Sequence, residues 1–189
     1  MAKRVYFAFH YQDVIDFRAN VVRNHNFLGV EATGYYDHSM WEEAKKTSVL
    51  ALKRLINSEL QNTSVTAVLI GTQTWGRRWV RYEIIKSIER GNRVIGIHIN
   101  GIKGKDGLRK PLGINPFDNL GVEVSPDGTR ATPTEWKDGK WVYYSDLDVF
   151  DIVEQPAANR GKHLSLSHWL PVYDWVAGDG FSNFSSWIS

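Results

Sequence analysis

The residues most suited to chemistry lie between positions 68 and 84, in the stretch VLIGTQTWGRRWVRYEI. This stretch reads as an apolar strand, a polar loop and then a helix that carries Glu83. Open parallel sheets bind ligands at the carboxyl ends of their strands, so a carboxylate early in a helix that begins there points toward the expected crevice. Position alone leaves a second interpretation open, in which Glu83 is a surface residue that favours the helix dipole or pairs with Lys86.

Several established motifs are absent from the sequence. There is no Gly-x-Gly-x-x-Gly after the first predicted strand, no Gly-x-x-x-x-Gly-Lys-Ser/Thr and no Gly-x-Ser-x-Gly. These absences argue against a Rossmann dinucleotide site, a P-loop and an α/β-hydrolase. The chain has no cysteine and no His-Glu-x-x-His, so we expect neither a metal site nor thiol chemistry.

The elements that would position Glu83 alternate between strands and helices along the first half of the chain. The apolar runs predict strands at residues 4–9, 28–34, 65–70 and 93–99, and the helical spacing of apolar residues predicts helices at 13–24, 39–60 and 78–90. Strands that are apolar throughout indicate a parallel sheet covered on both faces. We therefore expect an α/β fold with a doubly wound, flavodoxin-like sheet.

The second half has a different pattern. Strands are predicted at 120–124, 129–136 and 140–144, separated by the turn signals Asp127-Gly128 and Asp138-Gly139. The end of the chain is rich in tryptophan and is expected to pack back on the sheet. We therefore expect one domain over residues 1–189, with a core at about 1–118 followed by hairpins and a packing segment at about 119–189.

Composition limits the classes of partner. Hydrophobic residues make up 42% of the 189 residues and charged residues 23%, which is typical of a globular protein. The net charge of +2 gives no reason to expect nucleic-acid binding. No apolar run approaches the roughly 20 residues that a membrane span needs, and none resembles a signal peptide. We expect a cytoplasmic protein without membrane contact.

Four segments together resemble the TIR domains that consume NAD. The helix start WVRYEI at 79–84 resembles the catalytic Trp-x-x-x-Glu helix of that family, and VYFAFHY at 5–11 resembles its first strand and following loop. The segment at 90–97 resembles the strand after that helix, and residues 37–39 lie where TIR domains carry a ligand loop. Over its whole length, the chain is similar to the TIR-domain signalling components of Thoeris antiphage systems.

This resemblance implies an activity and a set of partners. Members of that family cleave the nicotinamide–ribose bond of NAD during phage infection and make a cyclic ADP-ribose isomer. The isomer activates a partner effector that depletes cellular NAD, which causes abortive infection. The resemblance thus implies NAD as a substrate, no separate cofactor, an activity that depends on a phage-derived trigger, and possible homo-oligomers.

The resemblance also implies site residues. Glu83 matches the catalytic glutamate, and it should act as an ionised carboxylate, so deep burial without partners would oppose this role. The expected substrate-binding residues are Phe9, His10, Tyr11, Asp37, Thr74, Trp75 and Trp79. Core packing is the favoured alternative for Phe9, and it is weighed equally for Tyr11 and Trp75. The basic loop at 103–110 could meet phosphates, although a solvated loop is the more common outcome.

Two other functions stay open at this point. A non-catalytic TIR adaptor would act by self-association or partner binding, and it would be favoured if Glu83 were buried in a structural ion pair. A nucleotide sensor on the same fold would bind its ligand tightly without turnover.

Overall fold

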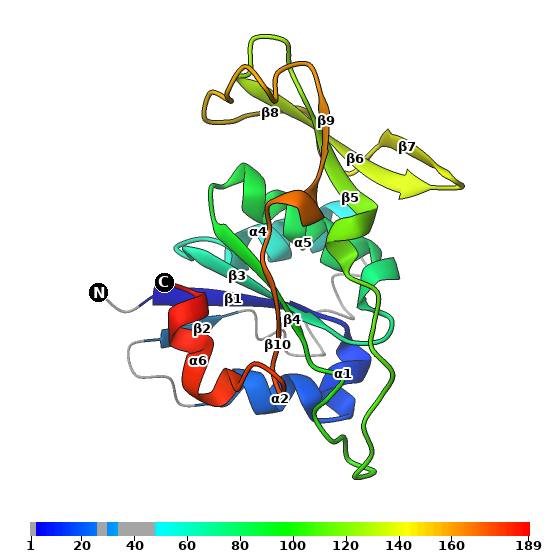
Figure 1. Cartoon of the computed structure of the whole chain (residues 1–189), viewed down its shortest axis with the longest axis vertical. Helices are drawn as coiled ribbons and strands as arrows, with labels where there is room; N and C mark the ends of the chain where they lie inside the picture. Colours follow the sequence, from blue (N-terminus) through cyan, green and yellow to red (C-terminus); the bar gives the residue numbers. More distant parts are fainter. Residues whose placement is uncertain (1–2, 26–29, 34–47) are drawn as a thin grey trace.

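The computed structural model describes residues 3–25, 30–33 and 48–189, and its centre is a five-stranded parallel sheet (Figure 1). The strand order is β10-β4-β3-β1-β2, and every neighbouring pair is parallel. The strands are β1 (Lys3–Phe9), β2 (Val30–Thr33), β3 (Val65–Ile70), β4 (Arg93–His98) and β10 (Val172–Asp174). This arrangement confirms the doubly wound sheet predicted from the apolar strands.

Helices cover both faces of this sheet (Figure 1). On one face lie α4 (Val49–Glu59) and α5 (Arg78–Glu89), and on the other lie α1 (Tyr11–Ile15), α2 (Arg18–Arg23) and α6 (Gly180–Trp187). All six residues of β3 are buried; Val68 and Ile70 belong to one hydrophobic cluster, and Val65, Ala67 and Leu69 belong to the other. A strand buried on both faces is mostly apolar, which explains the clear sequence signal of β3, whose one polar residue, Thr66, forms a hydrogen bond with Ser87.

Two of the predicted helices have other bounds in the structure. The helix expected at 13–24 is broken at Phe17, whose φ of 66° is left-handed and whose side chain is exposed rather than buried. Of the helix expected at 39–60, the described part is α4, which begins after Ser48. Ser48 is extended and caps α4 by accepting a hydrogen bond from the Ala51 N–H at 3.0 Å. The start of that predicted helix, at 39–47, lies outside the described residues.

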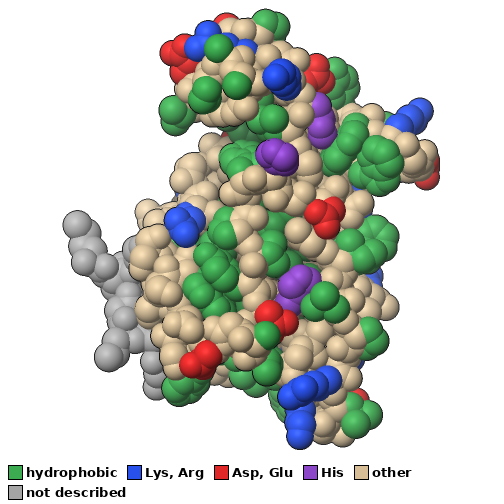
Figure 2. All heavy atoms as spheres, in the orientation of Figure 1, with side chains coloured by type: hydrophobic (Ala, Val, Ile, Leu, Met, Phe, Trp, Pro, Cys, Tyr) green, Lys and Arg blue, Asp and Glu red, His purple; other side chains and the backbone are tan. Residues whose placement is uncertain are grey.

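A second sheet extends beyond the central one (Figure 1). It is antiparallel, with the order β7-β6-β5-β9 and a short strand β8 paired to β6. Its strands are β5 (Leu120–Val124), β6 (Arg130–Lys137), β7 (Lys140–Tyr143), β8 (Phe150–Asp151) and β9 (His163–Ser165). The three predicted strands and both Asp-Gly turns are confirmed. Figure 2 shows acidic and basic side chains interspersed on this sheet.

The end of the chain returns to the central sheet, as predicted. β10 becomes the fifth parallel strand beside β4, and α6 packs on the face that also holds α2. Phe184 stacks on Phe7 with ring centroids 6.0 Å apart, and Trp187 stacks on Tyr173 at 4.5 Å. The aromatic residues therefore complete the core of the central sheet. Three short 3-10 helices join these elements, η1 (Thr74–Gly76), η2 (Pro116–Asn119) and η3 (Leu166–His168).

Candidate active site

Glu83 lies on the side of α5 that faces the sheet. Its side chain is 4% exposed, and it shares this side of the helix with Val80, Ile84 and Ser87, which are also buried. The carboxyl group is thus part of the packed layer between helix and sheet. This placement excludes the interpretation of Glu83 as a surface residue.

One oxygen of the Glu83 carboxyl group has a partner from β1. The Tyr6 hydroxyl donates a hydrogen bond of 2.7 Å to Oε1, and both groups are buried. Oε2 is also buried, and among the described residues it has no hydrogen-bond partner. Tyr6 lies three residues before the carboxyl end of β1. The contact between Tyr6 and Glu83 therefore lies inside the sheet and not at its edge.

Burial changes the protonation of Glu83. It raises the pKa from 4.5 to about 8, although the hydrogen bond from Tyr6 acts in the opposite direction. In the ligand-free protein the group is therefore mostly protonated at neutral pH, which corrects the expectation of an ionised carboxylate. Glu83 forms no ion pair with any described residue. A structural ion pair at Glu83 would have favoured the adaptor, and the described part of the chain does not show one.

A chain of buried hydroxyl groups fixes the backbone of α5 at Glu83. The Ser87 hydroxyl donates to the Glu83 carbonyl oxygen at 2.6 Å and accepts from the Thr66 hydroxyl at 2.8 Å. Asn92 donates in turn to the Thr66 oxygen at 3.3 Å. Because Thr66 belongs to β3, these bonds set the position of the helix along the sheet.

The second sheet, through β6 and the loop after β7, holds the beginning of α5. The Arg78 guanidinium binds both oxygens of Asp146, at 2.8 and 2.6 Å, and the Tyr144 hydroxyl donates to the Arg78 carbonyl at 3.2 Å. Arg81 forms a 2.6 Å ion pair with Glu135 of β6. The bonds from Arg78 hold the pKa of the Asp146 carboxyl below its usual value. The antiparallel sheet thus supports the helix that carries Glu83.

The loop after β3 is organised around Thr74. Its buried hydroxyl accepts from the Gly71 N–H at 2.9 Å and contacts the Leu69 carbonyl at 3.4 Å. The buried Asp13 carboxylate lies so close to Gly71 that a Cβ there would clash with it. Burial raises the pKa of Asp13, against the lowering effect of the Lys110 charge. Thr74, predicted to bind substrate, therefore has a clear role in holding this loop.

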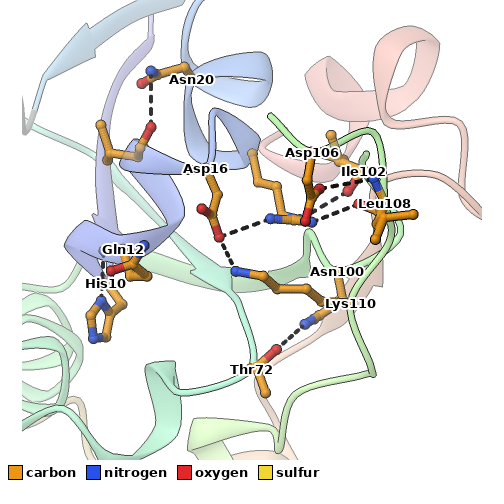
Figure 3. A network of polar contacts seen from close by, with 12 residues as sticks. His10, Gln12, Asp16, Asn20, Thr72, Asn100, Ile102, Asp106, Leu108 and Lys110 are labelled. Atoms are coloured by element: carbon orange, nitrogen blue, oxygen red, sulfur yellow. Dashed lines mark hydrogen bonds and ion pairs between the residues drawn. The ribbon is translucent and has the colours of Figure 1, made fainter. Parts of the chain in front are cut away.

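His10 and Tyr11 lie at the carboxyl end of β1. The His10 Nδ1 accepts a 2.8 Å hydrogen bond from the Gln12 N–H (Figure 3), which places the proton of the neutral ring on Nε2. Nε2 is buried and has no partner among the described residues. Burial, followed by the charge of Arg77, lowers the His10 pKa. The ring is thus a neutral donor at the sheet edge, and Tyr11 beside it is exposed.

The predicted aromatic residues do not all lie together. Trp79 lies one turn before Glu83 on α5, and its ring centroid is 5.9 Å from that of Tyr82 in a T-shaped contact. Trp75 lies in η1, nearby in sequence. Phe9, by contrast, packs on the opposite face of the sheet, under the Arg23 guanidinium at 4.8 Å. The structure therefore brings Trp79, but not Phe9, to the side of Glu83. Asp37 lies outside the described residues.

The basic loop at 103–110 is anchored rather than free. Buried Arg18 donates to the carbonyl oxygens of Ile102 at 3.0 Å and Leu108 at 2.8 Å, and it pairs with Asp16. Lys110 forms a second ion pair with Asp16. Sequence reasoning missed this anchor because the break at Phe17, which precedes Arg18, has no clear sequence signal.

The described residues show neither a cluster of metal ligands nor a helix that could span a membrane. No group of three or more His, Cys, Asp or Glu side chains with the spacing of a metal site occurs in 3–25, 30–33 and 48–189. Within those same ranges, no helix has the length and apolar character that crossing a bilayer requires.

Comparison with known proteins gives two similarities. A sequence model of the family described as "Thoeris protein ThsB, TIR-like domain" matches residues 6–103. The chain is also 59% identical, over 192 residues, to a protein of Bacillus cereus (strain MSX-D12) named "Putative cyclic ADP-D-ribose synthase ThsB1", and the match covers 100% of both chains. The region matched by the family model contains Tyr6 and Glu83, together with Thr66 and Ser87.

Proposed function

Because the chain belongs to the Thoeris ThsB family of TIR-like proteins, we propose that it cleaves NAD and forms a cyclic ADP-ribose isomer as a signal in antiphage defence. The name of the Bacillus cereus relative supports the cyclising activity. The structural observation that carries the proposal is the buried Glu83 carboxyl group, with one oxygen held by Tyr6 and the other without a partner among the described residues.

Bond cleavage needs a negative charge next to the ribose. When the bond between the anomeric carbon and nicotinamide breaks, its electron pair leaves with the neutral nicotinamide, and the ribose acquires oxocarbenium character. A carboxylate in a low-dielectric site stabilises that positive charge more strongly than one in water. In this proposal Glu83 provides the carboxylate and its Oε2 faces the ribose.

The raised pKa of Glu83 fits a positively charged substrate. A buried glutamate with a pKa of about 8 holds a proton until a nearby positive charge favours ionisation. The nicotinamide ring of NAD carries such a charge. We propose that substrate binding ionises Glu83 and releases the proton, so that the carboxylate forms only when the reactive bond is beside it.

Cyclisation differs from hydrolysis in the group that attacks the ribose. In hydrolysis, a water oxygen bonds to the anomeric carbon and its proton leaves, which gives ADP-ribose. In cyclisation, a nucleophilic atom of the same molecule bonds to that carbon, and the products are a cyclic ADP-ribose isomer, nicotinamide and one proton. Cyclisation therefore requires a site that excludes water, and burial of Glu83 within the packed layer supports such exclusion.

The wider pathway is also proposed. The cyclic product would activate an NAD-depleting effector in the cytoplasm, after a phage-derived trigger has switched on synthesis. The proposal also includes the association of the chain with further copies of itself. An adaptor that works only through contacts is the alternative outcome of the test below.

The test compares wild type with Glu83→Gln in phage-infected cells. Extracts of each culture are added to the partner effector, and NAD loss is followed with time. The proposal predicts that only the wild-type extract activates the effector, with equal amounts of both proteins verified by immunoblot. Equal activation by both extracts would remove Glu83 from the mechanism and favour the adaptor.

A further inference from the structure

We propose that Tyr6 is the positioning residue for Glu83: its hydroxyl group fixes Oε1, so that Oε2 is the oxygen presented to the ribose of the substrate. This inference rests on the proposed function, because it assigns a second residue to the same reaction. It goes beyond the Trp79–Glu83 pattern, which lies within one helix, by assigning a role to a side chain on β1, a strand of the parallel sheet.

The geometry distinguishes the two carboxyl oxygens. Oε1 accepts from the Tyr6 hydroxyl at 2.7 Å in a fully buried contact, whereas Oε2 is equally buried without a partner among the described residues. An unsatisfied buried oxygen is costly and is rare in folded proteins. Such an oxygen is consistent with a group held ready for a ligand, since a bound cation or hydroxyl donor would satisfy it once the carboxyl group is ionised.

Both groups that form the contact are themselves fixed. Tyr6 is completely buried, and its backbone lies between β2 and β3 in the sheet, so its ring has little freedom. Glu83 is fixed through its backbone by the hydroxyl chain of Ser87 and Thr66. Because the Tyr6 ring and the Glu83 backbone are both held in place, the carboxyl group can move only by rotation about the last bonds of its side chain. The hydrogen bond from Tyr6 restricts that rotation.

The hydrogen bond also favours the charged form of the carboxyl group. Burial is the larger contribution to the Glu83 pKa and raises it, whereas the Tyr6 hydroxyl lowers it. Without this hydroxyl, a bound cation would have to overcome the full effect of burial before the carboxylate could form. Tyr6 thus makes ionisation on substrate binding easier as well as fixing the direction of the carboxylate.

The closing experiment uses Tyr6→Phe, which keeps the ring and removes only the hydroxyl group. Tyr82→Phe is the matched control, because Tyr82 belongs to the same hydrophobic cluster and its hydroxyl bonds to Asn57 at 3.1 Å instead of to Glu83. The first readout is a pH titration of the purified proteins by infrared difference spectroscopy, which follows the carbonyl stretch of a protonated carboxyl group. Glu83→Gln identifies the band that belongs to Glu83.

We expect the midpoint of the Glu83 band to rise by about one to two pH units in Tyr6→Phe, as the loss of a hydrogen bond to a charged group implies. The midpoint in Tyr82→Phe should equal that of wild type. A purely structural role for Tyr6 would leave the two variants alike, and equal midpoints in Tyr6→Phe and wild type would overturn the proposal.

The second readout is the amount of cyclic ADP-ribose isomer in infected cells, measured by mass spectrometry. We expect a decrease of about ten- to a hundredfold in Tyr6→Phe, as for a misplaced catalytic group, and wild-type amounts in Tyr82→Phe. If Tyr6→Phe makes normal amounts while Glu83→Gln makes none, the positioning role is wrong and the proposed function stands. If Glu83→Gln also makes normal amounts, the proposed function itself is wrong.

Discussion

The buried carboxyl group of Glu83 should make the protein less stable as the pH rises. Its pKa is 4.5 in an unfolded chain and about 8 in the folded protein. Between these values the folded state holds a proton that the unfolded state has lost, so the free energy of unfolding decreases with pH. The full effect of a difference of about 3.5 pH units is roughly 5 kcal/mol.

Glu83→Gln isolates this effect. A glutamine keeps the shape of the side chain and an oxygen that can accept from Tyr6, but it does not titrate. Histidines that also change charge, such as His10 and His98, are present in both proteins and cancel in the comparison. From about pH 6 to about pH 9, the stability of wild type should decrease by about 3 kcal/mol relative to the variant.

Urea unfolding followed by tryptophan fluorescence measures this difference. Both proteins are unfolded at several pH values, and the free energy of unfolding is extrapolated to water at each one. Parallel curves for the two proteins would refute the reasoning, because they would mean that the folded state does not hold the Glu83 proton more tightly than the unfolded chain. A difference that grows with pH in the opposite direction would also contradict it.

Three further predictions concern the surroundings of the site. Gly71→Ala places a methyl group against the Asp13 carboxylate and should decrease NAD binding by the purified protein, measured by calorimetry; unchanged binding would show that the loop after β3 is not part of the site. Asp146→Asn removes the charge that joins α4 and α5 to the loop after β7. Urea unfolding should show that the free energy of unfolding falls by about 2 kcal/mol. A much smaller decrease would mean that solvent screens most of these ion pairs. In the same assay, Phe184→Ala should lower the free energy of unfolding by about 3–5 kcal/mol, because Phe184 is buried. Phe181→Ala should lower it by less than about 1 kcal/mol, because Phe181 is exposed. Similar decreases for both variants would contradict the packing of α6.

Much of the fold could be predicted because its strands and helices follow clear physical patterns. β3 is buried on both faces, so every residue in it is apolar or small, and α5 shows buried residues at helical spacing. The turns at Asp127-Gly128 and Asp138-Gly139 need left-handed backbone, and Gly128 and Gly139 adopt it with φ of 80° and 77°. These signals are local in the sequence, so they can be recognised without knowledge of tertiary contacts.

Other features depend on contacts between distant parts of the chain. The strands β8, β9 and β10 have two or three residues each, which is too short for a recognisable alternation. The left-handed conformation of Phe17 is unusual for an aromatic residue, so no preference for it could be read from the sequence. The short strands are placed by pairing with β4, β5 and β6, and Arg18, which follows Phe17, is held by the distant carbonyl oxygens of Ile102 and Leu108.

The candidate site was predicted in part. The position of Glu83 on the helix after β3 was read correctly, but its depth and its partner Tyr6, which is 77 residues away, were not. The alternation of side chains along a strand could have excluded Phe9 from the predicted substrate-binding residues. Tyr6 and Phe9 are three residues apart in β1, so their side chains point to opposite faces of the sheet. That alternation places Tyr6 with Glu83 and Phe9 on the other side.

The most direct test of the central claim is NAD turnover in water enriched in oxygen-18. Extracts of phage-infected cells that express wild type or Glu83→Gln are exchanged into this water, supplied with NAD and analysed by mass spectrometry. We predict that wild type releases nicotinamide together with an equal amount of cyclic ADP-ribose isomer without the heavy isotope, since no water oxygen enters that product, and that Glu83→Gln releases neither. Labelled ADP-ribose as the main product of wild type, or unlabelled cyclic product from Glu83→Gln, would contradict the account.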